Sequence, residues 1–189
     1  MTDNTRPVTF LDGSIIKLCP MRKQDLQIYL KWLNNFEMVN YLMPHTPISE
    51  QIEDATLDKM VNADPADSVN LGIWLKEPEK LIGNLGLLRI DNRSRHAMLG
   101  IFIGEKDNWS KGYGTEAMRL VLEYGFKTLN LRKIWLAYMG HNDRGKAAYD
   151  KLGFKEIGRH REHQYIDGKY EDEVIMEVFK EEFFAAVKK

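Results

Sequence analysis

A glycine-rich string near the middle of the chain has the residue types of an anion-binding turn. The string is Trp109-Ser110-Lys111-Gly112-Tyr113-Gly114-Thr115-Glu116-Ala117. An apolar run over residues 99–103 precedes it and an amphipathic pattern follows it, so we expect a strand, a turn and a helix start. A helix start offers free backbone N–H groups and the positive end of the helix dipole, and both suit a phosphate or pyrophosphate. Gly112 and Gly114 leave room for that phosphate beside the backbone.

Three kinds of glycine turn could bind such a phosphate. The P-loop string G-x-x-x-x-G-K-[ST] is absent from the sequence. The dinucleotide fingerprint G-x-G-x-x-[GA] is matched by Gly112, Gly114 and Ala117, but residues 105–111 separate the match from the preceding strand, and too few βα units follow it. The third kind is a pyrophosphate loop for coenzyme A, which the downstream residues favour. A nicotinamide-dependent enzyme therefore remains a weaker alternative.

A second motif lies downstream of the glycine string. A predicted strand over residues 132–138 leads into Asn142, and a short predicted helix carries Tyr149, seven residues later. With the glycine turn, this segment resembles the GNAT acyltransferase superfamily, whose signature is N-x-[RK]-A-x-x-x-Y-x-K-L-G-F. Gly145 stands where the signature has alanine, and the rest of the string matches.

A third motif narrows the resemblance to one branch of that superfamily. Residues 156–176 contain the arrangement G-R-x-R-E…D-G-x-Y-x-D-x-x-x-M. This is similar to the branch that acetylates ribosomal-protein N-terminal alanines, polyamines and related amines. The resemblance covers roughly residues 9–179, and its specific motifs lie within 99–176. The resemblance implies an N-acetyltransferase with acetyl-CoA as its acyl donor. The implied acceptor is a primary amine of a small molecule, a polyamine or a protein N-terminus, which attacks the thioester directly.

The resemblance also implies which residues form the acetyl-CoA site. Tyr149 is the expected catalytic residue, a general acid that protonates the leaving thiolate, because a phenol with a reference pKa of about 10 stays protonated near neutral pH. A backbone N–H in residues 99–103 is expected to hold the thioester carbonyl. The expected acetyl-CoA contacts are Ile101, Phe102, Ile103, Trp109, Ser110, Lys111, Gly112, Tyr113, Gly114, Thr115, Asn142 and Lys146.

The general base stays open at this stage. Many relatives have a glutamate where this chain has Met98, which cannot accept a proton. Glu37, His96 and Glu105 are the candidates that remain, and a chain of water molecules without one dominant base is an alternative. Glu37, Tyr41 and His96 are the candidate contacts of the amine substrate. Because Met98 and Gly145 both depart from the residues common in the family, a non-catalytic acyl-CoA-binding module remains an alternative function.

Composition excludes several other classes of protein. A net charge of −1 without a Lys/Arg block argues against a nucleic-acid partner. The sequence has no apolar run of membrane-spanning length and no apolar core of a signal peptide near its start, so we expect no membrane partner and a cytoplasmic location. The lone Cys19 fits a reducing compartment. The string from His160 to His163 lacks a further Cys or His at ligand spacing, so we expect a solvated strand face and no metal site.

The order of predicted elements indicates the fold class. A chain of 189 residues with 43% hydrophobic residues is most simply one domain. The elements follow as ββααα, βββ, α, β, α, ββ, an α+β arrangement. The fold that the resemblance implies is a GNAT-like α/β sandwich with a central mixed, mostly antiparallel sheet flanked by helices. We expect one acyl-CoA N-acyltransferase domain over residues 1–189, with a substrate-side part at about 8–90, an acyl-CoA-binding core at about 95–179 and a short apolar tail. That tail, around residues 183–187, is expected to dock on the domain or on a second subunit, which leaves a homodimer open.

Overall fold

The structure is a computed structural model that describes residues 6–41 and 46–188. The strands are β1 Leu11–Asp12, β2 Ile16–Pro20, β3 Val69–Leu75, β4 Lys80–Asp91, β5 His96–Ile103, β6 Lys133–Met139, β7 Lys155–Ile166 and β8 Lys169–Phe179. The helices are α1 Leu26–Leu33, α2 Phe36–Val39, α3 Glu50–Val61, α4 Tyr113–Lys127, α5 Asp143–Lys151 and α6 Lys180–Val187. Short 3-10 turns at Lys23–Asp25 and Lys106–Asn108 precede α1 and the glycine turn.

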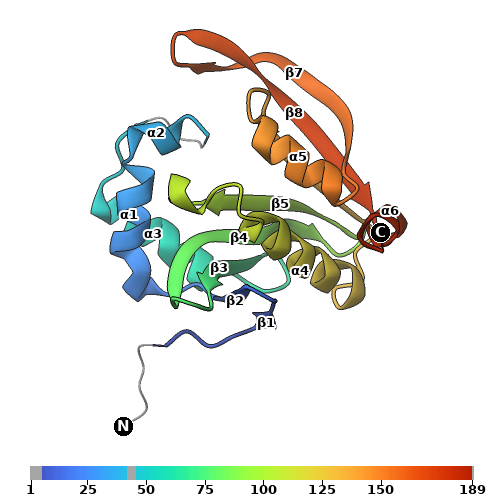
Figure 1. Cartoon of the computed structure of the whole chain (residues 1–189), viewed down its shortest axis with the longest axis horizontal. Helices are drawn as coiled ribbons and strands as arrows, with labels where there is room; N and C mark the ends of the chain where they lie inside the picture. Colours follow the sequence, from blue (N-terminus) through green and yellow to red (C-terminus); the bar gives the residue numbers. More distant parts are fainter. Residues whose placement is uncertain (1–5, 42–45, 189) are drawn as a thin grey trace.

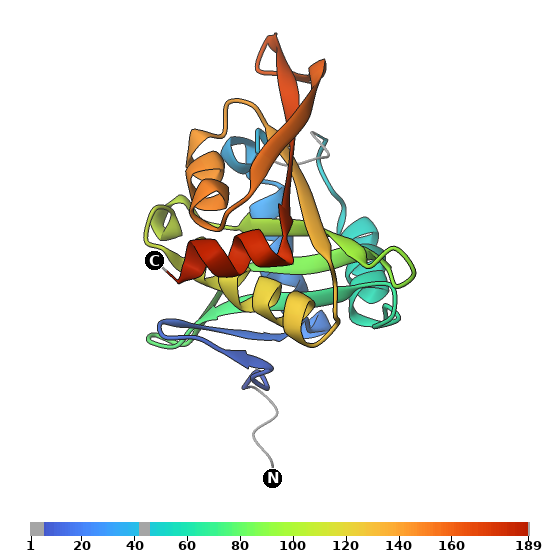
Figure 2. The ribbon, with the colours of Figure 1, turned by 90° about the vertical axis from the view of Figure 1, so that its right-hand side faces the viewer.

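The described strands form one mixed eight-stranded sheet in the order β1-β2-β3-β4-β5-β6-β8-β7. Among them β5 and β6 run parallel, and the other neighbouring strands are antiparallel. Helices α1 and α3 lie on one side of the sheet, and α4 and α5 lie on the other (Figure 1). The β7–β8 hairpin extends beyond the rest of the sheet (Figures 1 and 2). The observed fold confirms the predicted α+β class and its mostly antiparallel sheet.

Alternating strand residues supply two separate cores, one on each face of the sheet. In β2, Leu18 packs into the large core that includes α4, while its neighbour Cys19 packs with Trp32 of α1 and Leu57 of α3. Successive strand side chains point to opposite faces, so this split follows from the strand period of two. The amphipathic pattern that follows the glycine string is helix α4, whose buried face includes Leu120. The sheet is therefore rigidly held from both sides next to the glycine turn.

Strands β5 and β6 diverge from one another along their length. Their register joins His96–Met98 to residues 133–135 and includes no later residue of β5. On its other edge β5 remains paired with β4 as far as Ile103. Beyond Met98, backbone groups on the β6 side of β5 therefore face an opening instead of a neighbouring strand. This opening is where the resemblance placed the N–H donor for a thioester carbonyl.

The segments at the two ends of the chain both pack against helix α4. Strand β1 covers only Leu11–Asp12, whereas Val8 is exposed and Phe10 packs edge-on against the ring of Tyr124. The apolar tail forms helix α6, whose Phe183 is fully buried beside Phe126 of α4. Of the two expected docking partners, the tail thus uses its own domain.

The helices before β3 largely follow the sequence pattern. Ser49 caps α3 by accepting a hydrogen bond from the Ile52 N–H at 3.3 Å, as expected. Helix α2 is a single short turn that ends at Val39, and Tyr41 lies in the turn that follows. Pro44, expected at the start of a loop beside the substrate, lies outside the described residues.

Candidate active site

The glycine string forms a tight turn between β5 and α4. Ser110 and Gly112 have positive φ values of 58° and 85°, and α4 begins directly after Gly112. Glycine adopts this left-handed backbone at little cost, which explains the residue type at Gly112. The indole N–H of Trp109 donates to the Ile103 carbonyl at 3.1 Å and so ties the turn to the end of β5. The first turn of α4, whose N–H groups have no partner within the helix, therefore begins close to the end of β5.

A cavity of about 440 Å³ lies between this turn, the end of β5 and helix α5. Ten of the residues predicted from the sequence line it: Ile101, Ile103, Trp109, Ser110, Gly112, Tyr113, Gly114, Thr115, Asn142 and Tyr149. Two motifs that lie far apart in the sequence thus meet at one cavity, with the helix starts of both α4 and α5 on its wall.

Three predicted cofactor contacts do not line this cavity. The ring of Phe102 faces the other core, where its centroid lies 5.9 Å from that of Trp32, because neighbouring strand residues alternate between faces. Lys111 is exposed in the turn. The Lys146 ammonium pairs with Asp150 at 2.6 Å along the exposed side of α5. None of these three side chains lines the cavity, although the backbone of the turn at Gly112 does.

Tyr149 lies on α5 with its ring packed against two other aromatic rings. The ring centroids of Tyr138 and Phe154 are 5.4 and 6.0 Å away, and 7% of Tyr149 is exposed. Burial, reinforced by Tyr138, raises the pKa of the Tyr149 phenol to about 12. The phenol is therefore protonated at neutral pH and can serve as a proton donor inside the cavity.

Asn142 orders the start of α5. Its side-chain oxygen accepts the Gly145 N–H at 3.0 Å, which is the N-cap of the helix that carries Tyr149. A Cβ added at Gly145 would lie 2.7 Å from the Asn142 amide nitrogen, so the alanine of the signature requires a different cap geometry from the one here. Glycine at position 145 thus leaves room for the Asn142 side chain to lie close to the backbone that it caps.

Arg144 is a site residue that was not among those predicted from the sequence. Its guanidinium carbon lies 3.4 Å from the centroid of the Trp109 ring and 5.4 Å from that of Tyr41. Burial lowers the pKa of the Arg144 guanidinium, which places this cation in partly desolvated surroundings at the cavity. The signal was present, because Arg144 occupies the Arg/Lys position of the GNAT signature. The stacking of Arg144 on the Trp109 ring explains why residue 109 is aromatic.

A second cavity, of about 430 Å³, lies between α2, the turn before α4 and the tip of the β7–β8 hairpin. Its lining includes three carboxylates, Glu37, Asp167 and Glu171, together with Tyr41 and His141. His141 and Asn142 are consecutive, so the two cavities lie on either side of one short segment.

His141 lines the second cavity and is followed directly by Asn142, which lines the first. Its Nδ1 lies 3.7 Å from a Glu171 carboxylate oxygen, and this buried nitrogen has no hydrogen-bond partner among the described residues. The Tyr41 ring lies 5.3 Å from the His141 ring and also 5.3 Å from the Trp109 ring. His141 was not predicted from the sequence, because its contact with Glu171 crosses thirty residues of chain.

The three base candidates from the sequence lie in different surroundings. His96 begins β5, at the end opposite to the cavity, and its ring nitrogen lies 3.8 Å from Asp91. A hydrogen bond from Lys80 holds the pKa of the Glu105 carboxyl below its usual range, which makes it a poor proton acceptor. Glu37 lines the second cavity and pairs with Lys106 at 2.7 Å. Of the three, Glu37 alone is brought to either cavity.

Comparison with known proteins identifies the family. Residues 16–155 match the acetyltransferase (GNAT) domain. The chain is 28% identical to a spermidine N(1)-acetyltransferase of Escherichia coli K12 over 171 residues, which cover 90% of this chain and 89% of that protein. It is 25% identical to the uncharacterized N-acetyltransferase p20 of Bacillus licheniformis over 176 residues, covering 89% of this chain and 94% of that protein.

Solved structures share the fold. The crystal structure of spermidine N-acetyltransferase from Vibrio cholerae in complex with CoA and spermine superposes with a TM-score of 0.81 at 24% identity, covering 91% of this chain and 99% of that one. A GNAT-family acetyltransferase from Bacillus anthracis superposes with a TM-score of 0.78 at 18% identity, covering 92% and 99%.

These findings decide between the alternatives left by the sequence. A dinucleotide-binding domain needs a mostly parallel sheet, whereas the described strands here are mostly antiparallel. A purely non-catalytic binding module is not favoured, since the family and the named relatives are acetyltransferases. Because the domain match spans most of the chain and the fold agrees with it, this chain belongs to the GNAT acetyltransferase family and is an N-acetyltransferase with acetyl-CoA as its acyl donor.

Proposed function

We propose that this enzyme acetylates a primary amine of a polyamine, with acetyl-CoA in the first cavity and the acceptor in the second. The observation that carries the proposal is the second cavity, whose lining holds three carboxylates and two lysines, directly beside the cavity that Tyr149 lines. The name of the Escherichia coli relative, a spermidine acetyltransferase, supports the same class of acceptor. A linear polycation suits such a site, because one amine can react while a charged amine remains paired with a carboxylate.

Lysine side chains already make the contacts that an acceptor ammonium would make. Lys106 pairs with Glu37 at 2.7 Å, and Lys169 pairs with Glu171 at 2.6 Å. Both lysine side chains are about half exposed or more, at 48% and 66%, and can move into solvent at little cost. We infer that the polyamine ammonium groups replace these lysines at the two carboxylates.

The proposed chemistry needs a base, a carbonyl donor and an acid. His141, which lines the second cavity with its Nδ1 3.7 Å from a Glu171 carboxylate oxygen, takes the proton from the attacking amine. The amine nitrogen forms a bond to the thioester carbon while an N–H of β5, beyond Met98, donates to the carbonyl oxygen. The C–S bond then breaks, and the Tyr149 phenol gives its proton to the leaving sulfur.

The cofactor assignment follows the lining of the first cavity. The N–H groups at the start of α4 bind the pyrophosphate, and Asn142 holds the α5 start against the pantetheine arm. Arg144 on the Trp109 ring closes the cavity on the acceptor side. In this assignment the side chains of Phe102, Lys111 and Lys146 make no essential cofactor contact.

The test is acetyl-CoA consumption with a panel of amines. Spermidine and spermine should be turned over with higher kcat/KM than putrescine, because they retain more charge after one amine is neutralised. Glu171→Gln should raise KM for spermidine about tenfold, the usual size of losing one charge-assisted contact, while KM for acetyl-CoA stays unchanged. Turnover of N-terminal alanine peptides in place of polyamines would refute the acceptor and leave the acetyltransferase activity intact.

The remaining parts of the proposal concern the whole chain. We propose one domain over residues 1–189, a cytoplasmic enzyme without a nucleic-acid partner, and a homodimer. Within the described residues no helix is long and apolar enough to cross a membrane. Light scattering of the purified full chain tests the homodimer, and a molar mass equal to that of one chain would refute it.

A further inference from the structure

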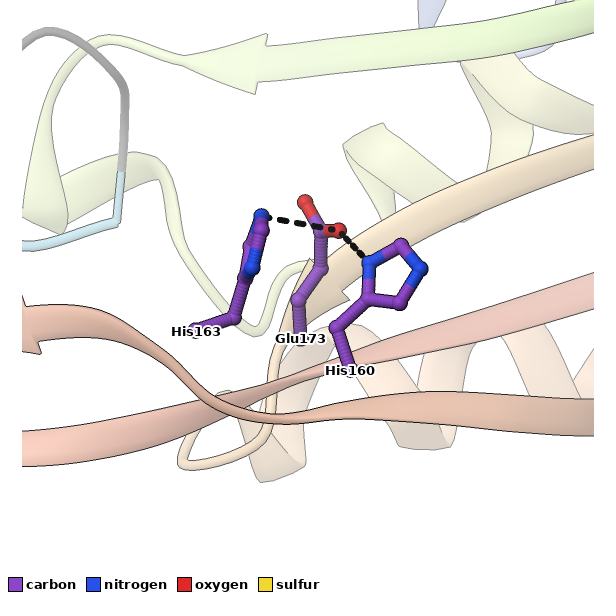
Figure 3. Close-up of side chains that lie close together, drawn as sticks. All are labelled: His160, His163 and Glu173. Carbon is purple, nitrogen blue, oxygen red and sulfur yellow. Dashed lines mark hydrogen bonds and ion pairs between the residues drawn. The ribbon is translucent and has the colours of Figure 1, made fainter.

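Two histidines and a glutamate meet on the β7–β8 hairpin, outside both cavities. His160 and His163 come from β7, and Glu173 comes from β8 (Figure 3). The His160 Nδ1 lies 2.9 Å from a Glu173 carboxylate oxygen, and the His163 Nε2 lies 3.8 Å from the same oxygen. The ligand-type atoms of these side chains all lie within 4.8 Å of one another. The sequence predicted a solvated strand face here, because no further Cys or His lies at ligand spacing, and Glu173 approaches only through the pairing of β7 with β8.

An irregularity in β7 brings the two imidazoles together. Residues three apart on a regular strand point to opposite faces. Here four residue steps in β7, from His160 to Gln164, oppose two steps in β8, from Glu173 to Glu171. Glu162 within this bulge has a φ of 51°, a left-handed conformation that residues other than glycine adopt infrequently. The bulge thus turns His163 to the same side as His160, which is a common use of bulges in sheets.

The donor set and its spacing match a transition-metal site. Imidazole nitrogen with one carboxylate oxygen is a ligand set that Zn²⁺ accepts, with bond lengths near 2.0–2.2 Å. Tetrahedral bonds of that length place neighbouring ligand atoms about 3.4 Å apart. The two separations from the Glu173 oxygen, 2.9 and 3.8 Å, lie on either side of that value, and all the ligand-type atoms lie within 4.8 Å of one another. Since the histidine side chains are about half exposed, small rotations suffice to reach it.

We propose that His160, His163 and Glu173 bind one divalent transition-metal ion, Zn²⁺ by preference, with water in the fourth position. The ion bridges β7 and β8 and so fixes the hairpin. Glu171, which lines the acceptor cavity, is two residues along β8 from Glu173 and on the same face of that strand. The proposed ion therefore stabilises one wall of the acceptor cavity without taking part in acetyl transfer.

Calorimetric titration of the untagged, metal-stripped full chain with Zn²⁺ tests the proposal. Cys19 is fully buried, so its thiol does not compete for the ion in the folded protein. We expect saturable binding of one Zn²⁺ per chain. His160→Ala and His163→Ala should each weaken binding about tenfold or more, since even second-sphere changes at metal sites reach that size. Arg161→Ala is the matched control on the same strand and should bind Zn²⁺ like the parent.

The outcomes separate a built site from loose binding to surface charge. An excess of Mg²⁺, a hard ion that prefers oxygen ligands, should not displace Zn²⁺ from the parent. The proposal is overturned if the parent shows no saturable binding, if both histidine variants bind with parental affinity, or if Mg²⁺ competes. It is also overturned if Arg161→Ala loses as much affinity as the histidine variants, because the effect would then come from the hairpin and not from the ligands. Metal binding is measured without any acetyl acceptor, so failure of the polyamine assignment leaves this result interpretable.

Discussion

Replacing Tyr149 by phenylalanine removes the proposed proton donor and leaves its packing in place. The ring contacts with Tyr138 and Phe154 do not involve the hydroxyl. With a pKa of about 12, the Tyr149 phenol keeps its proton near neutral pH, so the wild-type enzyme holds the proton that the leaving thiolate needs. General acid catalysis typically contributes about 10²–10⁴-fold, or about 2.7–5.4 kcal/mol of the barrier. We therefore expect Tyr149→Phe to lower kcat by that factor while KM for acetyl-CoA changes little.

The assay is single-turnover release of the coenzyme A thiol, which isolates the chemical step from product release. Tyr138→Phe is the matched control, since this neighbouring tyrosine is also 7% exposed and does not line the cavity. The control should retain the parental rate. If Tyr149→Phe kept its single-turnover rate within about threefold of the parent, a difference of about 0.7 kcal/mol, the phenol would have no role as acid.

The pH dependence provides an independent check on the same group. The pKa of Tyr149 is about 12 in the folded protein and about 10 in the unfolded chain. Its full contribution to the unfolding free energy is therefore present below pH 10 and is lost as the pH rises from 10 toward 12, where the unfolded chain ionises more readily. A pKa raised from about 10 to about 12 corresponds to about 3 kcal/mol of unfolding free energy as an order of magnitude. Tyr149→Phe should therefore lose less unfolding free energy than the parent between pH 10 and 12, measured by urea denaturation. The rate of the parent should rise with the pKa of its amine substrate and show no fall from Tyr149 below pH 10.

Further substitutions test the cofactor turn, the helix cap and the docked tail. Gly114→Val should weaken coenzyme A binding about 10- to 100-fold, measured by calorimetry. The fold should be kept, because the added Cβ meets only Ile101 and Ile103 at 3.6 and 3.9 Å. Unchanged affinity would refute the assignment of the turn to the pyrophosphate. Asn142→Ala should cost about 1 kcal/mol of unfolding free energy through the lost cap, and an unaltered denaturation midpoint would contradict that role. Phe183→Ala should cost about 3–5 kcal/mol, and a small loss would mean that α6 detaches in solution.

The cofactor side of the site could be predicted because its signals are local. The turn at Gly112 is encoded by residues next to one another, and the spacing of Asn142 and Tyr149 is two turns of one helix. Strand alternation would also have been a usable signal for Phe102. Its neighbours Ile101 and Ile103 line the cavity, so a residue between them on the strand points to the opposite face.

The acceptor side could not be predicted to the same extent, because its parts are distant in the sequence. His141 approaches Glu171 only after β8 has paired with β6, and Glu37 reaches the same cavity from α2. No periodicity or spacing reports such contacts. The base candidates taken from the sequence were mostly neighbours of the β5 strand, and two of them proved to lie away from both cavities.

The bulge in β7 shows the limit of strand patterns most clearly. On a regular strand, His160 and His163 would occupy opposite faces, and the interpretation as solvated residues would follow. The extra residues around Glu162 change which side chains share a face, yet a bulge is defined by the partner strand as much as by its own sequence. A shift of register therefore converts two unrelated surface histidines into a pair around Glu173. Sites of this kind become visible only when both strands of a hairpin are placed against each other.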